Sequence, residues 1–217
     1  MSFLHLEDKM LFLLISLIAS MILYPFLEGG GIQEVIIQAV FAFILISGVY
    51  AVSTSKRDLI ISIALGVPAF LSVIAVIIFQ RDQLFHLLNY IFSMLFYAFT
   101  ITRLLKYITH ADKVDNNVIY AAICVYILIG VAWSTVYLTI EQFIPGTFIF
   151  SYKESLTARS DLIYFSYTTL TTTGYGDIVS TNSIGRAAAI LESVTGVLYV
   201  AILISRLVSL YQHEHKD

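Results

Sequence analysis

A seven-residue segment in the C-terminal third of the chain has the residue types needed to hold a dehydrated cation. Residues 171–177 read Thr-Thr-Thr-Gly-Tyr-Gly-Asp. A cation that sheds its water needs replacement oxygens, and backbone carbonyl groups facing a common axis supply them. Gly174 and Gly176 permit backbone angles that a residue with a Cβ atom resists, so successive carbonyl groups can turn toward that axis. The segment therefore predicts an ion-binding strand, to which Thr172 adds its hydroxyl oxygen.

The residues just before this segment predict the helix that positions it. Ser160 and Asp161 suit a helix N-terminus because their side chains accept hydrogen bonds from free backbone N–H groups. A helix over residues 160–171 has about 12 residues, too short to cross a bilayer and typical of a re-entrant segment. The chain that follows must return as extended backbone, which a membrane tolerates only where protein shields it or where it lines a water-filled cavity.

The composition indicates that these elements lie in a membrane. The chain of 217 residues is 59% hydrophobic and 12% charged, against roughly 45–50% and about 25% in an ordinary soluble domain. This composition excludes a soluble monomer and a disordered chain. Six apolar blocks each reach the length of about 18 residues that a spanning helix needs: residues 10–27, 35–55, 59–80, 83–102, 116–140 and 187–205. We expect an all-α membrane protein with six transmembrane helices, and with the re-entrant pore helix and extended filter between the fifth and sixth.

The distribution of basic residues predicts the orientation. Cytoplasmic loops carry an excess of Lys and Arg. A cytoplasmic N-terminus places most of the 12 basic residues on the cytoplasmic side. We therefore expect a multi-pass membrane protein with both termini in the cytoplasm.

The segment and its surroundings resemble a known family. The Thr-Thr-Thr-Gly-Tyr-Gly-Asp segment, the aromatic run at 164–167, and Gly185-Arg186 followed eleven residues later by Gly196 resemble the pore of tetrameric potassium channels. The chain is similar to the prokaryotic six-span type with one pore loop per chain and without a voltage-sensor arginine helix. The similarity covers about residues 115–210, nearly half of the chain.

This resemblance implies a function and a set of site residues. It implies a homotetramer among membrane lipids that conducts K⁺ passively, with K⁺ as the permeant ion, no organic cofactor, no nucleic acid and no enzymatic activity. It divides the chain into a four-helix membrane domain of unknown role, residues 1–110, and a pore domain, residues 111–217. The implied ion-binding residues are Thr172, Thr173, Gly174, Tyr175 and Gly176, with K⁺ at the first four. The implied filter supports are Asp177, Tyr164, Thr169 and Glu192, and the implied gating hinge is Gly196.

Two departures from the family leave alternatives open. Thr173 stands where the family usually has valine, and Phe165 stands where many relatives have tryptophan. A weakly selective cation channel is therefore an alternative. A subunit of an ion transporter is a second alternative, disfavoured because such transporters link four pore loops and this chain has one.

The fourth apolar block offers little for voltage sensing. The basic residues of the fourth span are Arg103 and Lys106, which directly follow this block at its predicted cytoplasmic end. We expect them to be anchors whose stems lie along the membrane and whose charges reach the headgroups. The first four blocks contain no carboxylate that would act as a countercharge.

Glu192 is the acidic residue within the sixth block. It lies about 9 Å into the helix, counted from Arg186 at about 1.5 Å per residue. A carboxyl group inside a membrane is costly unless it is paired, hydrogen-bonded or protonated, and such a group by default indicates function. We favour a hydrogen bond to a pore-helix hydroxyl, such as that of Ser166 or Thr169, which would brace the filter. The alternative is a proton-sensitive gate.

Overall fold

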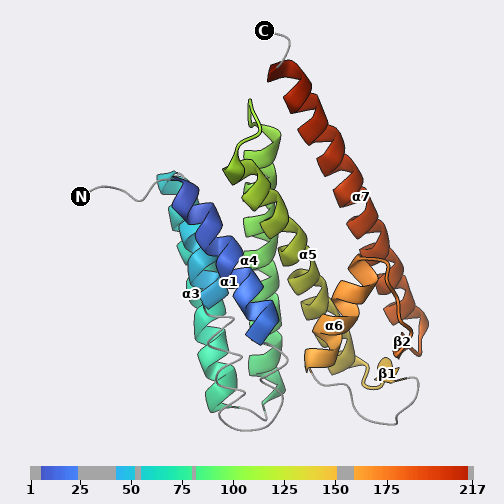
Figure 1. The fold of residues 1–217 in the computed structure, drawn as a ribbon. Coiled ribbons are helices and arrows are strands. Elements are labelled where there is room, and N and C mark those ends of the chain that lie inside the picture. The colour runs from blue at the N-terminus through green and yellow to red at the C-terminus, as the bar shows by residue number, and fades with distance from the viewer. Residues whose placement is uncertain (1–5, 24–42, 52–54, 80–81, 151–158, 215–217) are drawn as a thin grey trace. The chain divides into compact units, whose positions relative to one another are not determined.

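The computed structural model describes residues 6–23, 43–51, 55–79, 82–150 and 159–214 of the chain (Figure 1). The chain divides into two compact units, one up to Leu128 and one over Ile129–Lys216. The boundary between them falls inside α5, Asn116–Phe143. The division into residues 1–110 and 111–217 stays a prediction.

The first unit is built from helices that begin and end at side-chain caps. It contains α1, Leu6–Leu23, a helix at 43–51, α3, Lys56–Ile78, α4, Gln83–Thr109, and the first half of α5. At the start of α3 the Ser55 hydroxyl accepts from the Asp58 N–H at 3.1 Å, and at the start of α4 the Asp82 carboxylate accepts from the Leu84 N–H at 2.9 Å. These caps satisfy backbone donors that a helix leaves free at its N-terminus. The two helices pack against each other.

Four of the described helices are long and apolar enough to cross a membrane: α3, α4, α5 and the C-terminal helix α7, Ser183–Glu214. The apolar part of α1, Lys9–Leu23, is shorter. This agrees with the prediction of an all-α membrane protein. About half of the predicted second span, residues 35–55, falls outside the described residues, so the number of spans stays a prediction.

The observed helices extend beyond the predicted blocks, and one extension corrects the sequence analysis. Because α3 begins before residue 59, Asp58 lies in its first turn, where a carboxylate is favoured by the helix dipole. Its buried side chain forms an ion pair with Arg103 of α4 and accepts from the Ser55 hydroxyl at 2.9 Å. The expectation that Arg103 is only an anchor, with no countercharge in the first four spans, is therefore wrong.

The second unit surrounds a short helix. After α5 come β1, Phe148–Phe150, α6, Arg159–Leu170, β2, Ile178–Ser180, and α7. The two strands are antiparallel, with Ile149 opposite Val179. Because β1 precedes α6 and β2 follows residue 177, the pairing of the two strands holds the two ends of the predicted pore loop together. In Figure 1, α6 lies beside α7, with the strands at the end of that pair.

Three aromatic rings form the centre of this unit. Tyr137, Phe148 and Phe165 are all buried, and their ring centroids lie 5.0 to 5.3 Å apart. Edge-to-face and tilted contacts at this spacing stabilise aromatic clusters. Phe165 thus packs into an aromatic core together with Leu162, Ile178 and Ala188.

Candidate functional site

The short helix α6 is held closely on two sides by glycines. A Cβ atom at Gly130 of α5 would lie 2.5 Å from the ring of Tyr167, and a Cβ atom at Gly196 of α7 would lie 2.1 Å from the carbonyl oxygen of Leu170. A larger residue at Gly130 would have to displace the Tyr167 ring, and a larger residue at Gly196 would have to displace the backbone of α6. This contact gives a packing reason for glycine at position 196, within a helix that is continuous from Ser183 to Glu214. The hinge role of Gly196 stays a prediction.

The predicted ion-binding strand begins where α6 ends. The Thr173 N–H donates to the Thr168 carbonyl and the Thr172 N–H donates to the Thr169 carbonyl, both at 2.9 Å. Together with a φ of +58° at Thr172, this pattern is a Schellman motif, which usually has glycine at the left-handed position. The start of the strand is therefore fixed by the last carbonyl groups of α6.

Thr169 also joins this helix end to α7. Its carbonyl oxygen accepts from the Ser193 hydroxyl at 3.2 Å, and the residue is 9% exposed. The Ser193 hydroxyl and the close approach of Gly196 thus both secure the C-terminal end of α6.

The backbone of the strand alternates in handedness. Thr172, Gly174 and Gly176 have φ values of +58°, +51° and +78°, whereas Thr173 and Tyr175 between them do not have positive φ. When residues with positive φ alternate with residues of ordinary φ, successive N–H groups turn toward one side of the chain. The two glycines have the conformation for which the sequence suggested glycine. A β-branched residue with positive φ is a strained outlier, and such residues cluster at functional sites.

The far end of the strand is tied back to α6. The Tyr164 hydroxyl donates to the Asp177 carboxylate at 2.8 Å. The Tyr164 ring also lies parallel to the ring of Tyr175, with 6.5 Å between centroids and an interplanar angle of 1°. Asp177 additionally accepts from the N–H of Ile178, the first residue of β2. The residues implied as filter supports at this end thus contact one another or the strand.

The strand is uncovered in the single chain. Residues 171–176 are all exposed, and the side chain of Tyr175 is 72% exposed. Large apolar side chains of α7 are exposed as well, among them Ile190, Leu191 and Ile202. Apolar exposure on this scale indicates contact with lipid or with another protein surface.

Glu192 lies in the interior of the second unit with no exposed surface. Its carboxyl group contacts the Ser166 hydroxyl of α6 at 2.5 Å and accepts from the Tyr137 hydroxyl of α5. The expected hydrogen bond to Ser166 is therefore confirmed, and Thr169 contacts α7 through its carbonyl group instead. Tyr137 was not among the predicted site residues, although a phenol in the middle of an apolar span needs a hydrogen-bond partner.

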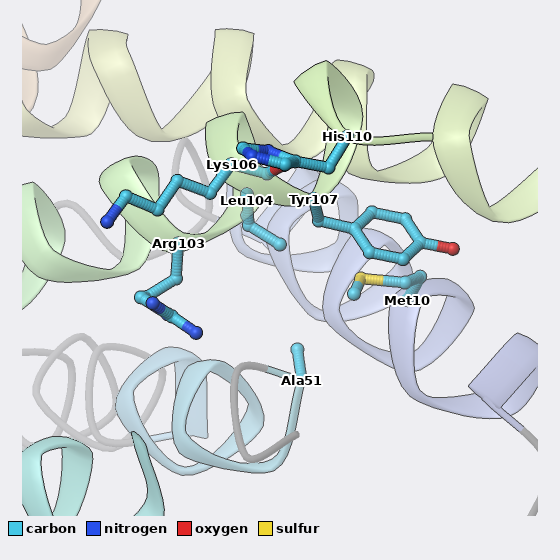
Figure 2. Close-up of a pocket in the computed structure, with 7 residues that line it drawn as sticks. All are labelled: Met10, Ala51, Arg103, Leu104, Lys106, Tyr107 and His110. Carbon is cyan, nitrogen blue, oxygen red and sulfur yellow. The ribbon is translucent and has the colours of Figure 1, made fainter. Parts of the chain in front are cut away.

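A separate cavity of about 310 Å³ lies in the first unit. Figure 2 shows the side chains that line it: Met10, Ala51, Arg103, Leu104, Lys106, Tyr107 and His110. Four of these are basic or titratable, but Arg103 is paired with Asp58 and the Nδ1 atom of His110 donates to the Lys106 carbonyl at 2.9 Å. Because Arg103 and His110 are engaged in this way, the cavity does not define an anion site.

The comparisons with known proteins bear on the second unit. Residues 137–213 match a family model described as "Ion channel". No curated protein and no solved structure matches the chain. The matched region contains α6, the strand at 171–177 and nearly all of α7. Together with the long apolar helices, the match supports an ion channel in a membrane, which is not a class of enzyme.

Proposed function

We propose that this protein is a homotetrameric potassium channel of the plasma (inner) membrane, with both termini in the cytoplasm. K⁺ would bind to the carbonyl groups of Thr172, Thr173, Gly174 and Tyr175 and to the Thr172 hydroxyl. The observation that carries the proposal is the alternation of positive and non-positive φ at 172–176, which turns successive N–H groups to one side and would leave the carbonyl groups facing the other. A row of carbonyl oxygens replaces the hydration shell of K⁺ in known channels.

The position of α6 supports a cation at the start of this row. The C-terminal end of a helix carries a partial negative charge, which favours a cation nearby. Because the Schellman motif joins α6 directly to Thr172, that end of the helix and the first carbonyl groups of the strand are adjacent. This arrangement would attract K⁺ without placing a formal charge in the pore.

The exposure of the strand supports a ring of identical chains. One strand offers oxygens from one side only, so a site that surrounds an ion needs further copies around an axis. Cyclic symmetry closes such a ring, and the exposed apolar residues of α7 supply surface for contacts between copies. The number four comes from the resemblance to tetrameric channels.

Thr173, which replaces the usual valine, is the reason to consider a weakly selective cation channel. The environment of its side chain, however, favours a potassium-selective channel. Its hydroxyl forms a hydrogen bond with the hydroxyl of Thr171 at 2.9 Å. The polar group that replaces the usual valine thus has a partner in its own chain and does not need to displace a carbonyl group of the strand.

The proposal is tested by ion flux into lipid vesicles that contain the purified protein. Gly174→Ala should abolish K⁺ uptake or its preference over Na⁺, because a Cβ atom disfavours a φ of +51°. The matched control is Gly146→Ala, which has a φ of +79° and open space around it but lies before β1. The control should conduct as the wild type does. Unchanged K⁺ preference in Gly174→Ala would contradict the assignment of the strand.

The same vesicles separate the alternatives. A weakly selective cation channel would take up K⁺ and Na⁺ equally in the wild type. A transporter subunit would show uptake without single-channel current steps, and native mass spectrometry would find a stoichiometry other than four chains.

A further inference from the structure

The environment of Glu192 is complete within one chain. Its side chain has no exposed surface, and neither has the side chain of Tyr137 or Ser166. Neighbouring copies and lipid therefore do not reach the carboxyl group. Its chemistry is set by the residues on α5, α6 and α7 that surround it.

Three short oxygen–oxygen contacts involve the Glu192 carboxyl group or the Ser166 hydroxyl beside it. The Tyr137 hydroxyl contacts Oε2 of Glu192, the Ser166 hydroxyl contacts Oε1 at 2.5 Å, and the same Ser166 hydroxyl contacts the Gly130 carbonyl oxygen at 2.7 Å. Oxygen atoms approach to such distances when a hydrogen atom lies between them. The three contacts thus require three hydrogen atoms.

An ionised carboxylate leaves this network one hydrogen atom short. Tyr137 and Ser166 each carry one hydroxyl hydrogen, and the Gly130 carbonyl is an acceptor only. The hydroxyl of Ser166 donates in one direction, so it serves either Glu192 or Gly130. If it donated to Glu192, the Gly130 oxygen would face the Ser166 oxygen at 2.7 Å with no hydrogen atom between them.

We infer that Glu192 is protonated on Oε1 and begins a directed chain of hydrogen bonds that positions the pore helix. The Glu192 carboxyl donates to the Ser166 hydroxyl, which donates to the Gly130 carbonyl, while the Tyr137 hydroxyl donates to Oε2. Each hydrogen atom then has one acceptor, and each contact has one hydrogen atom. Glu192 is in this sense a positioning residue, because it acts on the strand through α6.

The charges around the group agree with a neutral carboxyl. Among the residues that the structure describes, the partners of Glu192 are Tyr137 from α5 and Ser166 from α6, both uncharged. Tyr137 is the titratable group among them. A buried carboxylate without a cation is strongly unfavourable, and a protonated carboxyl avoids that cost.

The chain of hydrogen bonds holds α6 in the place where the predicted ion strand begins. It joins α7 to α6 and α6 to α5, and the close approach at Gly130 brings the carbonyl within reach of Ser166. The proton on Glu192 follows from this geometry, whereas a role for Glu192 at an ion filter rests on the proposed function. The inference deepens the proposed function by assigning Glu192 the role of a neutral link behind the filter.

Infrared spectroscopy of the full-length protein in lipid tests the proton directly. We expect the carbonyl stretching band of a protonated carboxylic acid at neutral pH, lost in Glu192→Gln. The matched control is Glu141→Gln, because the Glu141 carboxylate accepts from the N–H groups of Gly146 and Phe148 and has no need of a proton. The control variant should keep the band. Absence of the band in the wild type, or its persistence in Glu192→Gln, would overturn the inference.

A second variant keeps the test decisive if Glu192→Gln fails to fold. Ser166→Ala removes the acceptor of the carboxyl proton, so the band should remain but shift to higher frequency as its hydrogen bond is lost. An unshifted band would contradict the proton on Oε1. These spectra do not depend on conduction, so a channel that failed to select K⁺ could still show them, and the two proposals fail separately.

Discussion

Two buried carboxyl groups in this chain are stabilised in different ways, one by a cation and the other by hydroxyl groups. Asp58 lies in the first turn of α3 and is balanced by the guanidinium of Arg103, with the Ser55 hydroxyl as a second partner. Glu192 lies in α7 and has two hydroxyl partners and no cation among the described residues. Near the N-terminus of a helix, the unpaired backbone N–H groups and a nearby basic side chain can stabilise a carboxylate. Deep in a helix between other helices, a hydrogen-bonded neutral group costs less.

The largest effect that separates the two groups is expected from Glu192→Ala. It leaves a cavity and removes the partner of two buried hydroxyl groups, so the free energy of unfolding should fall by about 2–5 kcal/mol. Thermal unfolding in detergent measures this loss. Glu192→Gln is the matched control and should unfold close to the wild type, because an amide donates to Ser166 and accepts from Tyr137. Equal destabilisation by both variants would show that the group acts as an anion.

A smaller effect is expected from Gly130→Ala, which disturbs the Glu192 network without touching its side chains. The new methyl group would lie 2.5 Å from the Tyr167 ring, and overpacking of this kind typically costs about 1–3 kcal/mol. It should also weaken the link from Ser166 to α5, seen as a shift of the carboxylic acid band. Wild-type stability together with an unshifted band would mean that the contact with Gly130 is not needed.

The smallest effect is expected at the ion pair. Arg103→Gln should cost about 1 kcal/mol, since the Arg103 side chain is 30% exposed and solvent screens part of the attraction. In the double variant with Asp58→Asn the losses should not add, because each single change already breaks the pair. Lys106→Gln, on the same helix, should leave unfolding unchanged. Additive losses in the double variant would show that Asp58 and Arg103 do not stabilise the fold through their ion pair.

The elements that the sequence predicted well have strong local signals. Long apolar blocks predicted α3, α4, α5 and α7, and the capping residues with the short run after them predicted α6, Arg159–Leu170, to within one residue at each end. The contact of Ser166 with Glu192 was predictable because both residues lie in helices that flank the same segment.

The features that the sequence analysis missed depend on distant residues or on small shifts of a boundary. Tyr137 and Gly130 meet Ser166 and Glu192 only through tertiary packing, which periodicity does not reveal. The β1–β2 pair has three residues per strand, too few for an alternating pattern. The partner of Arg103 was missed because a predicted helix start of residue 59 excluded Asp58.

The most direct test of the central claim is a single-channel recording from the wild-type protein in a lipid bilayer, with K⁺ on one side and Na⁺ on the other. If residues 172–176 form a row of carbonyl sites for K⁺, the current should reverse at a potential far from zero, with the sign that K⁺ permeation requires. A reversal potential at zero with equal concentrations would contradict the claim and favour the weakly selective cation channel.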